Sequence, residues 1–307
     1  MIVKPEWATA RRLKPLTLFI VGLIHVFALV APFSFTWTGL IVCVVLYYLT
    51  GGLGITMCYH RLLTHRSYKT PKWFEYLLTF FGISALQGGP ISWVATHRLH
   101  HKESDQEPDP HTPQEGFLWS HLLWLMYEIP GFERYQEYRH MARDLERDPV
   151  HRFFEKSYFL LYVLSAVVLG GAGYLFGGWK LALSLVVWGC FLRTVSVWHS
   201  TWLVNSATHL WGYRRYKTTD NSRNNWWVAL ITFGEGWHNN HHADQRSAAH
   251  GHKWYEVDMT YWTIRFLQWI GLARDVVKPR FKRVATAANA AAAAVSPGSS
   301  RDSQEAA

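Results

Sequence analysis

The residues best able to do chemistry in this sequence are histidines, which gather in three short clusters. The clusters read His60-Arg-Leu-Leu-Thr-His65, His97-Arg-Leu-His100-His101 and His238-Asn-Asn-His241-His242. Residues three or four apart share one face of a helix, so the second and third clusters can each direct two imidazoles into one space. The first pair, five residues apart, would diverge by roughly 140° on an ideal helix. It must therefore straddle bound metal or lie where the helix is distorted.

Eight clustered imidazoles exceed the capacity of a single metal ion, which takes about four to six ligands, and they predict two ions. Neutral nitrogen ligands suit iron, zinc, copper and nickel, so the ligand type alone does not name the metal. His209, four residues after Asn205, stands near the clusters in the expected topology. Single histidines are more often ordinary polar side chains, and we place the remainder in that class: His25, His111, His121, His140, His151, His199, His250 and His252.

Four apolar stretches are suited to position these clusters against a membrane, at 16–33, 40–57, 158–179 and 181–204. A helix that crosses a bilayer needs about 20 mainly apolar residues. The pattern predicts an all-α integral membrane protein with four transmembrane helices in two hairpins. The stretch 74–95 is also apolar, but Gly88, Gly89 and Pro90 interrupt it, and we expect an interfacial or re-entrant segment there.

The number of crossings decides whether the clusters can meet. Four crossings leave all three clusters on one side of the membrane, whereas a fifth at 74–95 would separate them. Lysines and arginines before the first stretch and throughout 60–157 place both termini and this segment in the cytoplasm. We expect a cytosolic segment at 1–15, the main domain at 16–280, and a disordered tail at 285–307, which is rich in Ala and then in Ser, Gly and Pro.

The composition excludes several classes of protein. With 49% hydrophobic and 17% charged residues, the chain is not mainly disordered. Its net charge of +9 suits a partner that carries phosphates, and the apolar stretches favour a lipid bilayer over nucleic acid. Cys43, Cys58 and Cys190 lie far apart in apolar stretches and form neither a disulfide framework nor a CxxC site. Arg193, inside the fourth stretch, must be paired with His25, with backbone carbonyls or with a carboxylate near the cytoplasm.

The motifs HRLLTHRSYKTP, THRLHHKESDQEPDPH, TWLVNSATHLWG and GEGWHNNHH together resemble those of the membrane-bound fatty acid desaturases. The resemblance covers roughly residues 15–275 and is to the Δ9 acyl branch that includes stearoyl-CoA desaturase, in its bacterial form. It implies a bacterial inner-membrane protein whose four transmembrane helices are capped by a cytosolic helical domain. It also implies a di-iron site in this domain that uses dioxygen to introduce a cis double bond, at Δ9, into a saturated fatty acyl chain.

Carried over motif by motif, the resemblance also implies the site residues. The implied iron ligands are nine histidines, with one asparagine that acts through a water molecule: His60, His65, His97, His100, His101, His209, His238, His241, His242 and Asn205. Gln87, Trp93, Thr201 and Trp202 match positions around the kink of an acyl tunnel, and Tyr48 matches a position near its closed end. Asp109 and His111 either orient ligand imidazoles or form a simple loop turn.

The substrate and the electron donor stay open at this point. Ala95 and the stretch 126–129 stand where animal enzymes present basic side chains to coenzyme A, and Gly52 stands where they carry a bulkier residue near the tunnel end. The acyl carrier is therefore a thioester, of coenzyme A or acyl carrier protein, or a glycerolipid. The sequence holds no GxGxxG motif after a strand pattern. The resemblance implies an external donor of ferredoxin, rubredoxin or cytochrome b5 type.

Three other functions would use similar residues. A histidine-box hydroxylase of alkanes or lipids would insert oxygen at the same irons. A membrane metal transporter would place ionisable residues inside the spans, whereas here the clusters flank them. A soluble ferritin-like di-iron enzyme is considered because Glu137-Tyr-Arg-His140 and Glu235-Gly-Trp-His238 both read ExxH. That fold also needs two further glutamates and helices without a lipid-facing surface.

Overall fold

The fold is known from a computed structural model, which describes residues 12–128 and 139–280. Every extended regular element in these residues is a helix. The α-helices are α1 (Pro15–Ala28), α2 (Trp37–Tyr47), α3 (Lys72–Ser84), α4 (Pro90–Glu103), α5 (Phe117–His121), α7 (Arg143–Glu146), α8 (Pro149–Val186), α9 (Arg193–Leu210), α10 (Trp226–Ile231), α11 (His238–Ala243) and α12 (Met259–Trp269). Two π-helices are η3 (Tyr48–Thr64) and η7 (Val187–Leu192), and short 3-10 helices are η2 (Ala31–Ser34), η4 (Pro113–Glu115), η5 (Leu123–Met126) and η6 (Arg139–Ala142).

Two continuous helical stretches among the described residues are long and apolar enough to cross a membrane, Trp37–Thr64 and Pro149–Leu210. The second stretch folds back at Gly177 and Gly178, where the backbone leaves the helical conformation. Gly178 has a φ of +65°, which favours glycine. A Cβ at Gly173 would lie 2.6 Å from the Cα of Ala182, so the two arms touch beside this turn. The stretches expected at 158–179 and 181–204 are the arms of this hairpin.

The first apolar helix is shorter than expected. Helix α1 ends at Ala28, and the 3-10 helix η2 follows it, where Pro32 occupies one of the first two positions. Proline has no backbone N–H and disfavours continuation of the preceding helix, which explains why the helix does not reach residue 33. The predicted disordered tail at 285–307 and residues 1–11 lie outside the described residues.

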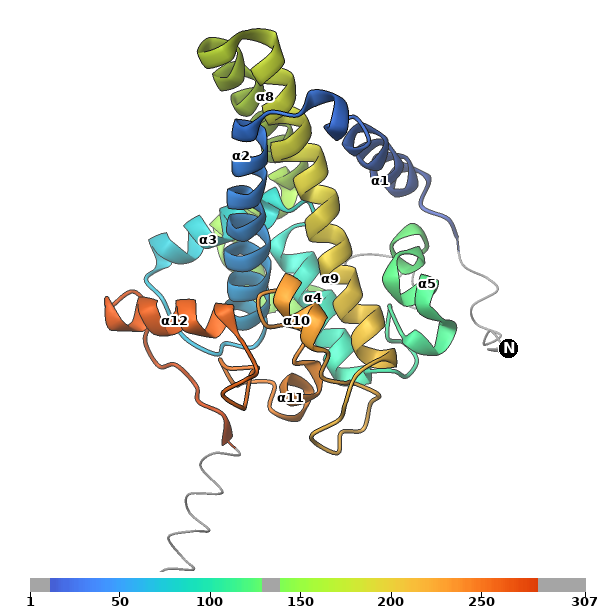
Figure 1. Ribbon diagram of the computed structural model, residues 1–307. Helices are drawn as coiled ribbons and strands as arrows, with labels where there is room; N and C mark the ends of the chain where they lie inside the picture. The colour runs from blue at the N-terminus through green and yellow to red at the C-terminus, as the bar shows by residue number, and fades with distance from the viewer. Residues whose placement is uncertain (1–11, 129–138, 281–307) are drawn as a thin grey trace, which may run out of the picture.

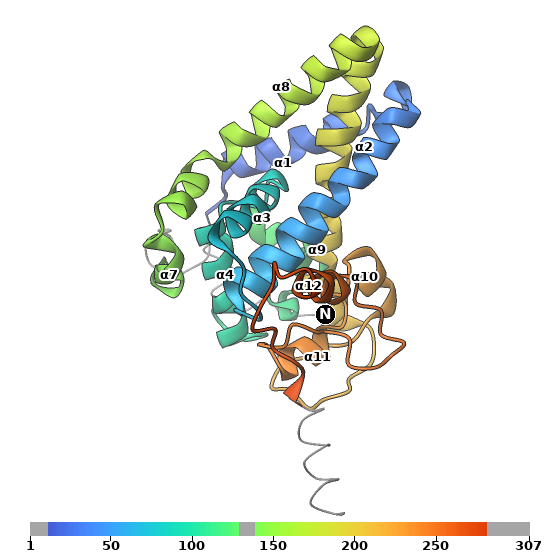
Figure 2. The same ribbon diagram turned by 90° about the vertical axis from the view of Figure 1, so that its left-hand side faces the viewer.

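The molecule has an apolar end and a histidine-bearing end. Helices α2 and α8 extend toward one end, while α4, α10 and α11 gather toward the other, where α9 also ends (Figures 1 and 2). Around the α8 turn, Leu175, Phe176 and Trp179 are 80%, 86% and 79% exposed. Exposed apolar surface of this kind marks contact with a partner or with lipid.

The segment expected to be interfacial, 74–95, forms α3 and the start of α4. Helix α3 lies close against η3, because a Cβ on Gly54 would come within 2.5 Å of the Gly82 backbone nitrogen. Of the partners considered for Arg193, the structure shows backbone carbonyls. Its Nη1 donates to Ser84 O at 2.6 Å and its Nε to Gly189 O at 3.0 Å. It thereby satisfies a carbonyl at the end of α3, a group that an isolated helix leaves unpaired.

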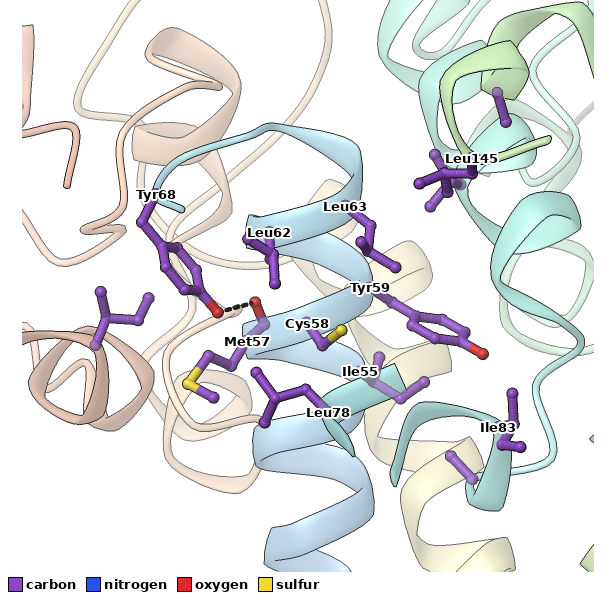
Figure 3. Packing of buried hydrophobic residues seen from close by; sticks show 14 of the residues in the cluster. Ile55, Met57, Cys58, Tyr59, Leu62, Leu63, Tyr68, Leu78, Ile83 and Leu145 are labelled. Atoms are coloured by element: carbon purple, nitrogen blue, oxygen red, sulfur yellow. Dashed lines mark hydrogen bonds between the residues drawn. The ribbon is translucent and has the colours of Figure 1, made fainter. Parts of the chain in front are cut away.

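A hydrophobic cluster holds η3 in place (Figure 3). Met57, Cys58 and Tyr59 are fully buried, and the Tyr68 hydroxyl donates to Met57 O at 3.0 Å. All three cysteines are free and buried, as the sequence predicts for packing residues. Because η3 carries the first histidine cluster at its end, this packing fixes the position of that cluster.

Candidate metal centre

The first histidine cluster lies on a distorted helix. The His65 backbone N–H donates to His60 O at 3.1 Å, which is the i→i+5 bond of a π-helix. Residues five apart then lie nearly above one another, and the two imidazole ring centroids are 4.8 Å apart. Of the two arrangements that the spacing left open for this pair, the structure has the distorted helix.

The other histidines come from three helices. His97, His100 and His101 lie on α4, which begins at Pro90. The Glu155 carboxylate from α8 accepts hydrogen bonds from the backbone N–H groups of Ile91 and Ser92, and so anchors the start of α4. His209 lies in the last turn of α9, and α11 carries His238, His241 and His242.

The nine histidines named from the sequence come together in two groups. In each group, the potential ligand atoms all lie within 4.8 Å of one another. The five-histidine group consists of His60, His65, His97, His101 and His241, and the four-histidine group consists of His100, His209, His238 and His242. The second and third clusters each contribute to both groups, because adjacent residues on a helix point about 100° apart. The second and third clusters are therefore each divided between the two groups, whereas the first lies wholly in the five-histidine group.

The spacing of the ring nitrogens fits bound metal. The Nε2 of His241 lies 3.1 Å from that of His60 and 3.0 Å from that of His101, while the Nε2 atoms of His209 and His238 are 3.1 Å apart. Two ligands at right angles around an ion with bonds of about 2.1 Å would be about 3 Å apart. A single N–H proton on His241 cannot serve both neighbours. Each group therefore has the donor atoms and the spacing to hold one metal ion.

Four carboxylates contact histidines of the two groups. Each carboxylate meets the Nδ1 atom of its imidazole, which leaves Nε2 as the atom that could bind a metal. The pairs are His60 with Glu235 at 2.5 Å, His100 with Asp109 at 2.9 Å, His209 with Asp105 at 2.9 Å, and His242 with Asp220 at 2.5 Å. Such partners fix the orientation of an imidazole and raise its basicity as a ligand. The sequence offered Asp109 as such a residue, but it did not predict this role for Glu235, Asp105 or Asp220, which lie 175, 104 and 22 residues from their partners.

Burial and charge set the protonation states that a metal site requires. Burial first, and then neighbouring imidazoles, hold the pKa values of His97, His101, His238 and His241 well below that of free histidine. Burial lowers the pKa of His242 to about 4, against the opposing effect of Asp220. These imidazoles are neutral at physiological pH, which is the form that binds metal.

The carboxylates stay ionised for a different reason. Burial alone would raise the pKa values of Asp109 and Asp220, but contact with His100 and His242 respectively holds both pKa values far below the usual range. The negative charges therefore remain in place behind the imidazoles and offset the charge of a bound cation.

Sequence reasoning also missed one histidine of the site. His250 was classed among the single histidines, but its Nδ1 lies 3.2 Å from Glu235 Oε2, and its ring packs 4.3 Å from that of His241, centroid to centroid. Glu235 thus contacts both His60 and His250. Nothing in the spacing of single histidines distinguishes His250 from others, such as His25 and His199, which contact each other elsewhere.

Two cavities meet beside the five-histidine group. The larger, of about 340 Å³, lies among α1, α4, α8 and α9, and its walls include four residues named from the sequence: Gln87, Trp93, Thr201 and Trp202. The smaller, of about 40 Å³, continues along η3 toward Gly51 and Phe233. Both are lined by Trp93, His97, Thr201 and Asn205. Asn205 therefore lies at the junction of the two cavities.

Hydrogen bonds make the junction rigid. Trp93 Nε1 donates to Gln87 Oε1 at 3.2 Å, and Gln87 Nε2 donates to Thr201 Oγ1 at 2.9 Å. Tyr48 lies behind the far end of the smaller cavity, where its ring packs 5.3 Å from that of Phe233 and its hydroxyl contacts Thr263. Of the five tunnel residues expected from the sequence, four thus line the larger cavity, and Tyr48 packs against Phe233 in the wall of the smaller one.

Apolar helices, two histidine groups that could each hold a metal ion, and mainly apolar cavities that reach one of them are the features of a membrane-associated enzyme with an apolar substrate. Residues 35–267 match the family model described as fatty acid desaturase. An sn-1 stearoyl-lipid 9-desaturase of Anabaena variabilis is 51% identical over 262 residues, which is 85% of this chain and 92% of the relative. An sn-2 palmitoyl-lipid 9-desaturase of Nostoc sp. (strain 36) is 45% identical over 90% of this chain and 94% of the relative.

A third relative differs in the carrier and position that its name gives. An acyl-CoA C20 Delta5-desaturase of Anemone leveillei is 46% identical over 85% of this chain and 81% of the relative. The chain belongs to the fatty acid desaturase family. It is accordingly an oxidoreductase of fatty acid metabolism.

Proposed function

We propose that this protein introduces a cis double bond at Δ9 into a saturated acyl chain of a membrane lipid. The observation that carries the proposal is the meeting of two apolar cavities at His97 and Asn205, beside the five-histidine group. A saturated chain laid along this path has one pair of methylenes next to the metal-binding histidines. The names of the lipid 9-desaturases that are about half identical to this chain support the position and the carrier.

Two iron ions are the cofactor that we propose. The five-histidine group would hold one ion, and the four-histidine group with a water molecule on Asn205 would hold the other. When bound, the irons would supply the reduction of dioxygen that makes removal of hydrogen from an unactivated methylene possible. The overall reaction balances when one saturated chain, one dioxygen, two electrons and two protons give one alkene and two water molecules.

The residues of the protein position the acyl chain and exclude water from it. Trp93, Gln87 and Thr201, which are joined by hydrogen bonds, form a continuous wall at the junction. Holding the reacting carbons at one position makes the reaction effectively unimolecular and selects which bond is attacked. The aromatic walls formed by Trp198 and Trp202 exclude water from the reacting methylenes.

The membrane arrangement that we propose has four crossings: α1, the α2–η3 helix, and the two arms of the α8 hairpin with α9. The exposed apolar side chains around the α8 turn support contact with lipid at that end. The histidine-bearing end would form a cytosolic cap, with both termini in the cytoplasm, as the distribution of Lys and Arg favours. For a bacterial chain, this membrane would be the inner membrane.

A membrane lipid is a better substrate than a coenzyme A thioester on two grounds. The larger cavity is walled by Thr17 and Val21 of α1 and by Tyr158 and Phe159 of α8, which places it between proposed membrane helices. In addition, Ala95 is buried and the carrier-side stretch around Glu128 is acidic and apolar. These residues offer no cation to a nucleotide phosphate.

The product distinguishes this function from its rivals. In cells that lack their own desaturase and express the protein, membrane lipids should acquire a cis-Δ9 monounsaturated chain, located by mass spectrometry of dimethyl disulfide adducts. A hydroxylated chain without an alkene would establish the hydroxylase instead, and a Δ5 or Δ7 alkene would change the position but not the class. Purified protein that transports iron without consuming oxygen in the presence of lipid would establish the transporter.

The length of the smaller cavity predicts chain-length selection. A Cβ at Gly51 would lie 3.5 Å from both Phe233 and Val197, an ordinary contact, so Gly51→Ala fits and Gly51→Leu fills the end of the cavity. Each methylene of the substrate that no longer fits in the cavity disfavours the longer chain, relative to the shorter one, by about 1–3 kcal/mol. We expect Gly51→Leu to shift the products toward chains shorter by about two carbons. The measurement is gas chromatography of lipids from cells fed equal amounts of palmitate and stearate.

A matched control is Gly171→Leu, which adds the same side chain where a Cβ meets nothing within 4 Å. Its product distribution should equal that of the unchanged protein. An unchanged distribution in Gly51→Leu, with activity retained, would mean that the chain does not end at this cavity.

We propose an external one-electron carrier of ferredoxin, rubredoxin or cytochrome b5 type as the donor.

A further inference from the structure

A second opening reaches the five-histidine group from the side away from the acyl cavity. It is a shallow cleft of about 540 Å³ at the ends of η3 and α4 and in the loop after α11. Its lining includes His65 and His101 together with four basic residues, Arg66, Arg98, Lys102 and Arg246. We call these six residues the basic cleft. No acidic residue within the described chain lines it.

The basic cleft and the larger acyl cavity approach the same histidine group through different ligands. His97 faces the acyl cavity, while His65 and His101 face the basic cleft. His97 and His101 are partly exposed, whereas all members of the four-histidine group are buried. The five-histidine group therefore has one access route for hydrocarbon and another that is open to water.

Two of the four basic residues of the cleft, Arg66 and Arg98, share one carboxylate. Arg98 donates to Met141 O at 2.7 Å and to Leu63 O at 2.8 Å, and its ion pair with Asp144 at 2.8 Å holds it in place. Arg66 pairs with the same Asp144. One carboxylate thus serves two guanidinium groups, which leaves a net positive charge at the rim.

Lys102 and Arg246 complete the rim. The Lys102 side chain is 66% exposed, with Glu103 as its ion-pair partner at 2.6 Å, and Arg246 is exposed. Basic rims of this kind steer an acidic partner and raise its association rate. The cleft is small, and the interfaces of electron-transfer proteins are also among the smallest.

We propose that the basic cleft is the docking surface for an acidic one-electron carrier protein, and that electrons enter through His65 and His101. The proposal rests on the proposed function. In each encounter the reduced carrier would lose one electron, which a metal held by the five-histidine group would take up. Two encounters supply the two electrons that the formation of one double bond consumes.

The position of the cleft favours a protein over the membrane surface as its partner. The ends of α4 and α11, between which it lies, are at the opposite end of the molecule from the exposed α8 turn (Figures 1 and 2). With the apolar helices in the bilayer, the cleft faces the aqueous phase, where a soluble carrier or the soluble head of an anchored one can reach it.

Charge reversal at the two exposed cations of the rim, Lys102 and Arg246, tests this. We expect the double variant Lys102→Glu/Arg246→Glu, as the full-length purified protein, to bind plant-type [2Fe–2S] ferredoxin at least about tenfold more weakly at low ionic strength. Raising the salt concentration should weaken binding of the unchanged protein toward the same level. The ratio of ferredoxin-driven to methyl-viologen-driven desaturation should fall in parallel. Arg265→Glu, on α12 outside the cleft, is the matched control and should keep the original affinity.

Three outcomes decide the proposal. Loss of ferredoxin affinity in the double variant but not in the control supports it. Equal affinity in the two variants overturns it. Reduced binding to vesicles of anionic phospholipid with unchanged ferredoxin affinity also overturns it, because the cleft would then be a membrane contact. If no form of the protein desaturates lipid with either reductant, the proposed function fails, while the affinity measurement still decides whether the cleft binds the carrier.

Discussion

A His241→Ala variant is expected to lose desaturation entirely and to retain at most one of the two proposed irons. His241 Nε2 lies within 3.1 Å of His60 and His101, so it joins the third cluster to the first and second in one group. Without it, the five-histidine group has no member from α11. Because metal binding and local folding are coupled, the neighbouring imidazoles should also lose order. The measurements are iron content of the purified protein and cis-alkene content of the lipids.

Two further variants serve as comparisons for His241→Ala. Asp220→Asn keeps the His242 imidazole but removes the carboxylate behind it, and should weaken iron binding by about 10–100-fold without abolishing it. His140→Ala removes an exposed histidine that lies outside both groups and should keep both irons. Full iron content and unchanged alkene formation in His241→Ala would contradict the assignment of the five-histidine group.

The clustered histidines could be singled out from the sequence because residues that face the same space from one helix obey short spacing rules. His97 with His101 and His238 with His242 are each four residues apart, and each pair stays within one group. The division of adjacent residues, such as His100 and His101, between two groups depends on the angle at which helices α4 and α11 face each other. That angle is a property of tertiary packing, which local spacing does not record.

Most of the carboxylates that contact these histidines could not be predicted from the sequence, again because tertiary packing brings them together. Asp109 could be proposed because it follows His100 closely in the chain, and the structure places it 2.9 Å from that imidazole. Glu235 is 175 residues from His60, so only the folded chain brings them together. The π-helix η3 is a further case, because it depends on close packing of Gly54 against α3 rather than on a local preference. Sequence patterns thus identify donor atoms better than they identify what orients them.

The largest expected effect on stability comes from Arg61, which is fully buried in the layer behind the histidines. Its guanidinium donates to Glu235 Oε1 at 3.0 Å, to Asp258 Oδ2 at 3.0 Å and to Ala248 O at 2.6 Å. Glu235 in turn holds His60, and Asp258 accepts from the Tyr261 N–H at the start of α12. One side chain therefore ties η3, the third cluster and α12 together.

Arg61→Leu is expected to lower the free energy of unfolding by about 3–5 kcal/mol, because it leaves two buried carboxylates without a cation. Thermal unfolding in detergent, monitored by tryptophan fluorescence, should show a clearly lower transition temperature, with iron content falling in parallel because Glu235 no longer has a fixed position. Arg61→Lys keeps the charge but not the forked geometry and should recover only part of the loss. Adding Glu235→Gln to Arg61→Leu should restore stability by removing one unpaired charge. A transition temperature in Arg61→Leu equal to that of the unchanged protein would mean that water reaches these carboxylates and that Arg61 does not hold the layer together.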